Sequence, residues 1–191
     1  MTGKSYLSWG AVLGGSVVAL AISAFLIQFG TTAGLSVGDP VLSDGSPSWN
    51  VVIAGLWILL VALASSAAGG YLAGRMRRGW GDATAHEVEF RDGAHGLVVW
   101  AVASIAIGSS AFLFTAVSSL ATTAAPAGAA IEVSEAVQDL TANISVILAF
   151  SSAAAAALGA GAAWSAAKLG GEHRDKGVDV NTLVPIFGKR R

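Results

Sequence analysis

Four apolar stretches of this chain are each long enough to cross a lipid bilayer, at residues 9–30, 49–72, 97–120 and 144–167. None of them contains Asp, Glu, Lys, Arg or His. The hydrocarbon core of a bilayer is about 30 Å thick, which takes about 20 residues of α-helix to cross. Because the backbone finds no water in hydrocarbon, stretches of this kind are predicted to be helices with internal hydrogen bonds.

These stretches predict the fold class and the domain organisation. We expect an all-α, polytopic membrane protein with four transmembrane helices in a tightly packed antiparallel bundle. Residues 1–169 form the bundle, and residues 170–191 form a polar cytoplasmic tail. The composition agrees, because 54% of the 191 residues are hydrophobic and only 12% are charged. A typical soluble domain carries about twice that share of charged residues.

The first stretch raises the alternative of a cleavable signal peptide. A signal peptide has an apolar region of about 7–15 residues, followed by a cleavage site of small residues. Here the apolar run is longer, the Ala-Leu-Ala motif at 19–21 lies inside it, and three further stretches follow. We therefore interpret residues 9–30 as an uncleaved first span.

The basic residues all fall on one side of the predicted membrane. Lys4 precedes the first stretch, and the other Lys and Arg residues lie between the second and third stretches or after the fourth. The two remaining connections contain acidic residues but no Lys or Arg. Basic loops are retained in the cytoplasm. With the Ala- and Gly-rich composition, this predicts a multi-pass protein of the bacterial inner (plasma) membrane with both termini cytoplasmic.

Small and polar residues recur at spacings of three and four along every stretch. In hydrocarbon, small side chains let helix backbones approach closely, and such contacts drive helix association. We therefore predict a packing seam inside the bundle, with the alternative that some of these faces contact another subunit. The predicted packing residues are Gly10, Gly14, Ala21, Gln28, Gly69, Gly70, Gly74, Ser104, Gly108, Thr115 and Gly159.

Gln28 is the most polar side chain within any of the four stretches. One interpretation is an interhelical hydrogen bond worth about 1 kcal/mol. The other is a contact with a transported substrate or ion. Because intramembrane transport sites usually recruit ionisable groups, we favour the hydrogen bond. The corresponding prediction is that Gln28→Leu lowers thermal stability in detergent.

The connection between the second and third stretches contains a weak candidate polar site, formed by His86, Asp92 and His95. The spacing of these residues matches no zinc pattern, so we predict no metal site and no cofactor. Asp92 is expected instead to cap the third helix, with His95 on its first turn. The alternating sequence HEVEF at 86–90 favours a short extended segment. On the outer side, residues 132–140 have the spacing of an amphipathic surface helix.

Motifs of established catalytic or nucleotide-binding sites are absent from the sequence. It contains no cysteine, no P-loop, no dinucleotide fingerprint and no G-x-S-x-G. The basic residues lie next to the spans, without a nucleic-acid-binding motif. We therefore predict no enzymatic activity, no catalytic residues and no nucleic-acid partner.

The favoured function is that of a structural or accessory protein in the lipid bilayer. It would act through helix–helix contacts, either as a homo-oligomer or as a subunit of a larger membrane complex. The alternative is an oligomeric channel or transporter with a path lined by Ser, Thr and Gln.

Three motifs carry a resemblance to a group of membrane proteins. They are SWGAVLGGSVVALA at 8–21, GGYLAGRMRR at 69–78 and DGAHGLVVWAVAS at 92–104. With these motifs, the first three stretches resemble a family of uncharacterised bacterial inner-membrane proteins. The resemblance implies an integral inner-membrane protein and supplies no catalytic residues.

Overall fold

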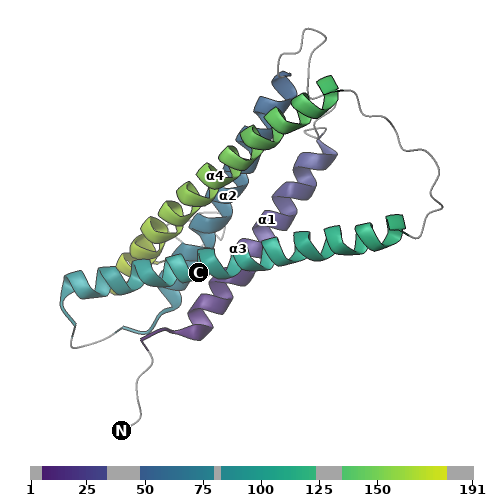
Figure 1. The fold of residues 1–191 in the computed structure, drawn as a ribbon. Coiled ribbons are helices and arrows are strands. Elements are labelled where there is room, and N and C mark those ends of the chain that lie inside the picture. The colour runs from purple at the N-terminus through teal and green to yellow at the C-terminus, as the bar shows by residue number, and fades with distance from the viewer. Residues whose placement is uncertain (1–5, 34–47, 80–82, 124–134, 180–191) are drawn as a thin grey trace.

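The computed structural model describes residues 6–33, 48–79, 83–123 and 135–179, and within these ranges it describes side-chain surroundings outside residues 111–151. The described chain forms four helices and no strand: α1 (Trp9–Thr32), α2 (Trp49–Met76), α3 (Ala85–Thr123) and α4 (Glu135–Asp175) (Figure 1). The predicted all-α class and the predicted four helices are confirmed.

The first three helices have the length and apolarity needed to cross a membrane. α1 and α2 qualify over their whole lengths, and α3 qualifies over residues Ala85–Ser110. The fourth predicted span, residues 144–167, falls within α4 and lies partly outside the residues whose side chains are described. The chain is therefore a helical bundle with the character of a membrane protein.

α3 begins well before the apolar stretch that predicts it. Its first residue is Ala85, so residues 86–90 are helical and the prediction of an extended segment there is wrong. The alternation of polar and apolar residues over five positions is too short to distinguish a strand from a helix end. The Thr84 carbonyl already accepts a helical hydrogen bond from the Val88 N–H at 3.0 Å.

α4 also extends beyond its apolar stretch at both ends. It begins at Glu135, so the described part of the predicted surface helix is continuous with the fourth span, while residues 132–134 lie outside the described chain. It ends at Asp175, inside the predicted tail. Gly170 and Gly171 are buried there, against Tyr71 and Asp92, and this packing outweighs the low helix propensity of glycine.

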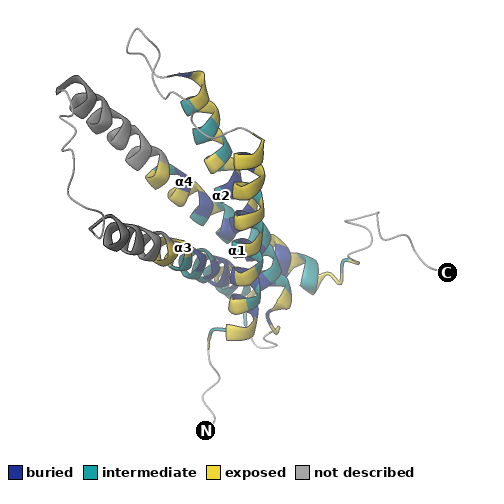
Figure 2. Cartoon of the chain, turned by 90° about the vertical axis from the view of Figure 1, so that its right-hand side faces the viewer, coloured by how far each residue is buried: buried dark blue, intermediate teal, exposed yellow. Residues whose placement is uncertain are grey.

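α2 is the central helix of the bundle. It contacts α1, α3 and α4, and α3 in turn contacts α1 and α4. The helices lie close together where α1 and α3 begin and where α2 and α4 end (Figure 2). We call this the polar end. α3 crosses the other helices at a steep angle (Figure 1).

α1 and α2 cross with their backbones in contact at Gly15 and Gly69. A Cβ atom added to Gly69 would lie 2.6 Å from the Gly15 carbonyl oxygen and 2.9 Å from the Ala19 Cβ. Both glycines also lie against Val99 of α3. Three helices therefore meet at a point where only glycine leaves enough space.

α2 and α4 pack in the same way closer to the polar end. Gly70 lies against the backbone of Ala163, and Gly74 lies against the backbone of Ala167. Both alanines are fully buried. The structure places four of the predicted packing residues at buried helix contacts: Gly69, Gly70, Gly74 and Gly159.

The buried face of α1 differs from the predicted one. Gly10, Ala21 and Gln28 are exposed and Gly14 is half-buried. At about 100° per residue, they lie on the opposite side of α1 from its buried residues. Small residues occupy both of these sides of α1, so their spacing alone does not show which side packs against the bundle. α2 approaches the side opposite to the predicted one, and that side is buried. The buried residues of α1 are Ala11, Val12, Gly15, Ser16, Ala19, Ser23 and Gly30.

The packing face of α3 also differs from the predicted one. Ser104 and Gly108 are exposed, whereas Val99 and Ala103 are buried. The buried face continues from polar residues in the first turns of α3, which the predicted span starting at residue 97 leaves out. Thr115 lies outside the residues whose side chains are described.

Candidate polar site at one end of the bundle

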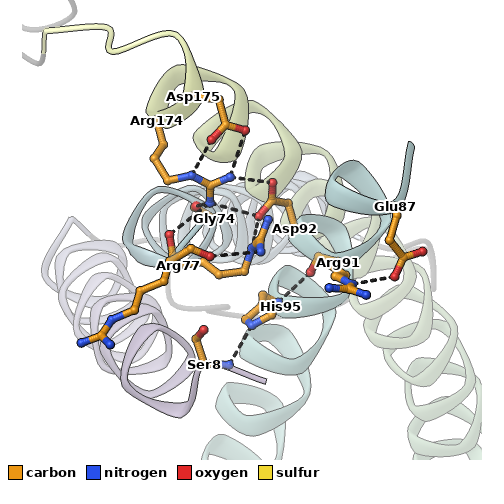
Figure 3. A network of polar contacts seen from close by, with 10 residues as sticks. Ser8, Gly74, Arg77, Glu87, Arg91, Asp92, His95, Arg174 and Asp175 are labelled. Carbon is orange, nitrogen blue, oxygen red and sulfur yellow. Dashed lines mark hydrogen bonds and ion pairs between the residues drawn. The ribbon is translucent and has the colours of Figure 1, made fainter. Parts of the chain in front are cut away.

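The polar end brings together polar and charged groups from α3, from α4 and from the residues that adjoin α1 and α2 (Figure 3). We define the polar cluster as Ser8, Arg77, Asp92, His95 and Arg174. Ser8 directly precedes α1, Arg77 follows α2, Asp92 and His95 belong to α3, and Arg174 lies in the last turn of α4. Arg77, Asp92 and His95 are each at most 2% exposed.

One carboxylate holds two guanidinium groups in this cluster. Asp92 Oδ1 accepts a hydrogen bond from Arg77 Nε, and Asp92 Oδ2 accepts one from Arg174 Nη2 at 3.3 Å. The three residues come from the end of α2, the first turns of α3 and the end of α4. A charge this deeply buried is tolerated only when it is paired. The cluster therefore fixes how these three helix ends meet.

Arg174 also completes the C-terminus of α2. Its Nη1 donates to the carbonyl oxygen of Gly74 at 2.8 Å and to that of Arg77 at 3.2 Å. Carbonyl groups in the last turn of a helix have no intrahelical donor. Burial lowers the pKa of Arg174, but its hydrogen bonds to Asp175 and Asp92 outweigh this effect, so the pKa of the guanidinium is raised. Arg174 is therefore charged throughout the physiological range.

His95 links α3 to the segment that enters α1. Its Nε2 accepts a hydrogen bond from the Ser8 backbone N–H at 2.9 Å. Its Nδ1 lies 2.6 Å from the Arg91 carbonyl oxygen, which can only accept. Nδ1 must therefore carry the ring proton and Nε2 must be unprotonated. The hydrogen bonds define a neutral imidazole in a single tautomer.

The three predicted site residues do not form one site. Asp92 and His95 lie in the polar cluster, but His86 is exposed and outside it. Asp92 does not cap α3, because the helix begins at Ala85. At this start the Thr84 hydroxyl accepts a hydrogen bond from the Glu87 backbone N–H at 3.4 Å. Within the described ranges, no three His, Asp or Glu side chains are grouped as a metal ion requires.

A shallow cavity of about 350 Å³ opens beside the polar cluster, between the start of α3 and the end of α4. Its charged side chains pair with one another, as Lys168 does with Glu89 at 3.0 Å and Lys176 does with Glu172. The hydrogen bond and charge of Lys176 lower the pKa of Glu172. The described wall of this cavity is thus a set of satisfied ion pairs.

Sequence reasoning missed Arg77 and Arg174 as members of the cluster. From the sequence, Arg77 indicates the membrane topology and Arg174 belongs to the predicted tail. A signal was present, because Arg77 comes five residues after one apolar stretch and Asp92 comes five residues before the next. Opposite charges at adjoining helix ends are candidates for an ion pair. Nothing in the spacing indicated that Arg174 would reach the same carboxylate.

Comparison of the chain with protein-family models, with curated proteins and with solved structures gives no match. The interpretation of its surfaces and of the polar cluster therefore depends on their own geometry.

Proposed function

We propose that this chain is an integral protein of the bacterial inner membrane that acts as a structural or accessory component through helix–helix contacts with further copies of itself. Both termini lie in the cytoplasm in this proposal, and the chain belongs with the inner-membrane proteins that its motifs resemble. Its role is assembly rather than catalysis.

The observation that carries the proposal is the face that α1 turns away from its own bundle. Gly10, Ala21, Ala24 and Gln28 are exposed there. At about 100° per residue they share one side of the helix, opposite its buried face. Nothing lies within 4 Å of a Cβ added to Gly10. Small side chains on a membrane helix allow another helix to approach closely, which is the main source of association in hydrocarbon.

Gln28 gives this face a second property that favours a protein neighbour. Its side chain is exposed in an apolar helix, whose large residues Phe25, Ile27 and Phe29 are also exposed. An amide in hydrocarbon loses its hydrogen bonds to water. In a symmetric dimer the same residue of the second copy lies opposite and supplies both a donor and an acceptor. A pair of this kind contributes about 1 kcal/mol.

The hydroxyl groups of Ser65 and Ser110 do not favour the channel alternative. Ser65 is buried and donates to the Val61 carbonyl of its own helix at 2.7 Å. Ser110 likewise donates to the Ile107 carbonyl at 2.8 Å. Hydroxyls that bond to their own backbone offer little to a passing solute.

Disulfide crosslinking in native membranes tests the proposal, and the chain has no cysteine to interfere. We expect single Ala21→Cys and Ala24→Cys variants to form covalent dimers on mild oxidation. Matched controls are Ala19→Cys, which is 2% exposed inside the bundle, and Ile27→Cys, which is exposed on another side of α1. Absence of dimers at Ala21 and Ala24, or equal yields at Ile27, would refute the proposal. A product of unequal mass would identify a different subunit instead.

A further inference from the structure

His95 is enclosed by charged groups that leave no place for an additional positive charge. The ring is 1% exposed. Arg77 of α2 and Arg174 of α4 face it, together with Asp92 of its own helix. On the α1 side its neighbour is the Ser8 backbone N–H. Asp92, the acidic group among these, is already shared by the two arginines.

Protonation is incompatible with the hydrogen bonds that the ring makes. A proton added at Nε2 would point at the Ser8 N–H, so that two donors face each other across the present 2.9 Å. Nδ1 cannot offer an alternative acceptor, because it already donates to the Arg91 carbonyl oxygen. The closed arrangement therefore accepts only the neutral ring.

We define the α1 entrance as residues 8–11, where the chain enters the first helix. We propose that protonation of His95 releases the α1 entrance from α3, so that the attachment of the first helix to the bundle is acid-sensitive. The switch is local. The two hydrogen bonds of the ring go to the Ser8 N–H and to the Arg91 carbonyl of its own helix, so the contact that protonation breaks is the one between α3 and the start of α1. The switch is also independent of the proposed dimer face, which lies on the opposite side of α1.

The expected size of the effect follows from proton linkage. Histidine in water has an ordinary pKa of about 6.5. Below that pH, opening of the α1 entrance takes up one proton, because the open state binds it and the closed state does not. The open population then rises by up to about tenfold for each pH unit.

Cysteine accessibility measures this opening directly in the full-length protein. Ala11 is 5% exposed, two residues into α1, so an Ala11→Cys variant should react with a polar maleimide only when the entrance opens. The exposed Gly79→Cys variant, which has open space around the new side chain, corrects for the pH dependence of thiol reactivity. We expect the corrected rate to rise about fivefold between pH 6.5 and pH 5.5, because the open-state histidine is already half protonated at pH 6.5.

Histidine variants assign the effect. In the Ala11→Cys background, His95→Gln should give a flat pH profile, because glutamine accepts a hydrogen bond but does not titrate. The double variant His86→Gln/His173→Gln leaves His95 as the sole histidine of the chain and should keep the full rise. If the His95→Gln variant fails to fold, this double variant decides the outcome, since a flat profile there overturns the proposal.

Two further results would also overturn it. One is a rise that persists in a folded His95→Gln variant. The other is an equal rise for Ser66→Cys, which is 8% exposed in α2 away from the polar cluster, because acid would then be loosening the whole bundle rather than the α1 entrance.

Discussion

The crossing of α1 and α2 at Gly69 allows the packing of this bundle to be tested with a single methyl group. In a Gly69→Ala variant the new Cβ would lie 2.6 Å from the Gly15 carbonyl oxygen, 2.9 Å from the Ala19 Cβ and 3.0 Å from Val99 Cγ1. Ordinary contact begins at 3.4 Å, so the first distance falls 0.8 Å short. The atom in the way is backbone, which no change of rotamer can remove.

The two helices must therefore separate by a few tenths of an ångström to about 0.8 Å. A gap of that size forfeits roughly a quarter to a half of the dispersion energy of each contact along the crossing. Overpacking of this kind costs about 1–3 kcal/mol. The alanine gains up to about 1 kcal/mol of helix propensity in return. We expect a net loss of up to about 2 kcal/mol.

Gly55→Ala is the matched control. It makes the same chemical change in α2 itself, but nothing lies within 4 Å of the added Cβ. Propensity alone should then leave the protein as stable as the wild type or slightly more so. Reversible unfolding in SDS-containing micelles measures both variants. If Gly69→Ala is as stable as Gly55→Ala, the backbones of α1 and α2 are not in contact at this point.

Three further predictions concern charge, assembly and topology. Asp92→Asn leaves the buried Arg77 guanidinium without its carboxylate partner, while Arg174 keeps Asp175, and should cost about 3–5 kcal/mol in the same unfolding assay. Lys168→Gln, which breaks a partly exposed pair with Glu89, should cost at most about 1 kcal/mol, and similar losses would contradict the buried pairing. Because Gln28 is exposed, Gln28→Leu should leave the melting temperature of the monomer in detergent unchanged, contrary to the sequence-based prediction, and should reduce Ala21→Cys crosslinking in membranes. A protease site appended after Arg191 should be cleaved only from the cytoplasmic side of membrane vesicles, and cleavage from the periplasmic side would reverse the proposed orientation.

The helices themselves could be predicted from the sequence because their lengths are imposed by the bilayer. α1 and α2 lie close to the stretches 9–30 and 49–72, since hydrocarbon leaves the backbone no alternative to a helix. Outside hydrocarbon this constraint disappears. The start of α3 at Ala85 and the end of α4 at Asp175 depend on tertiary contacts, and neither was predicted.

The orientation of each helix about its own axis could be predicted less well. On α2, Gly69, Gly70 and Gly74 are buried. α1 has small residues on two opposite sides, and the predicted face with Gly10 and Ala21 proved to be the exposed one. Choosing between two such sides requires knowing which one α2 approaches, and that is a property of the pair rather than of either helix.

The candidate polar site shows the same limit for charged residues. His95 and Asp92 were singled out for their chemical type, and both are buried in the polar cluster. His86 had the same claim from sequence and is exposed. The role of each residue depends on whether its side chain faces the neighbouring helix ends. The direction of a side chain turns by about 100° per residue, so it differs between positions only a few residues apart.

The order in which the ribosome delivers the members of the ion-pair cluster has a consequence for biogenesis. Arg77 and Asp92 flank a short connection and are synthesised in close succession, so they can pair as soon as α3 has entered the membrane. Arg174 comes at the very end of α4, and it both joins Asp92 and covers the open carbonyls of α2. A nascent chain that stops short of residue 174 would have Asp92 paired with Arg77 alone, and the Gly74 and Arg77 carbonyls would lack the donor that Arg174 supplies.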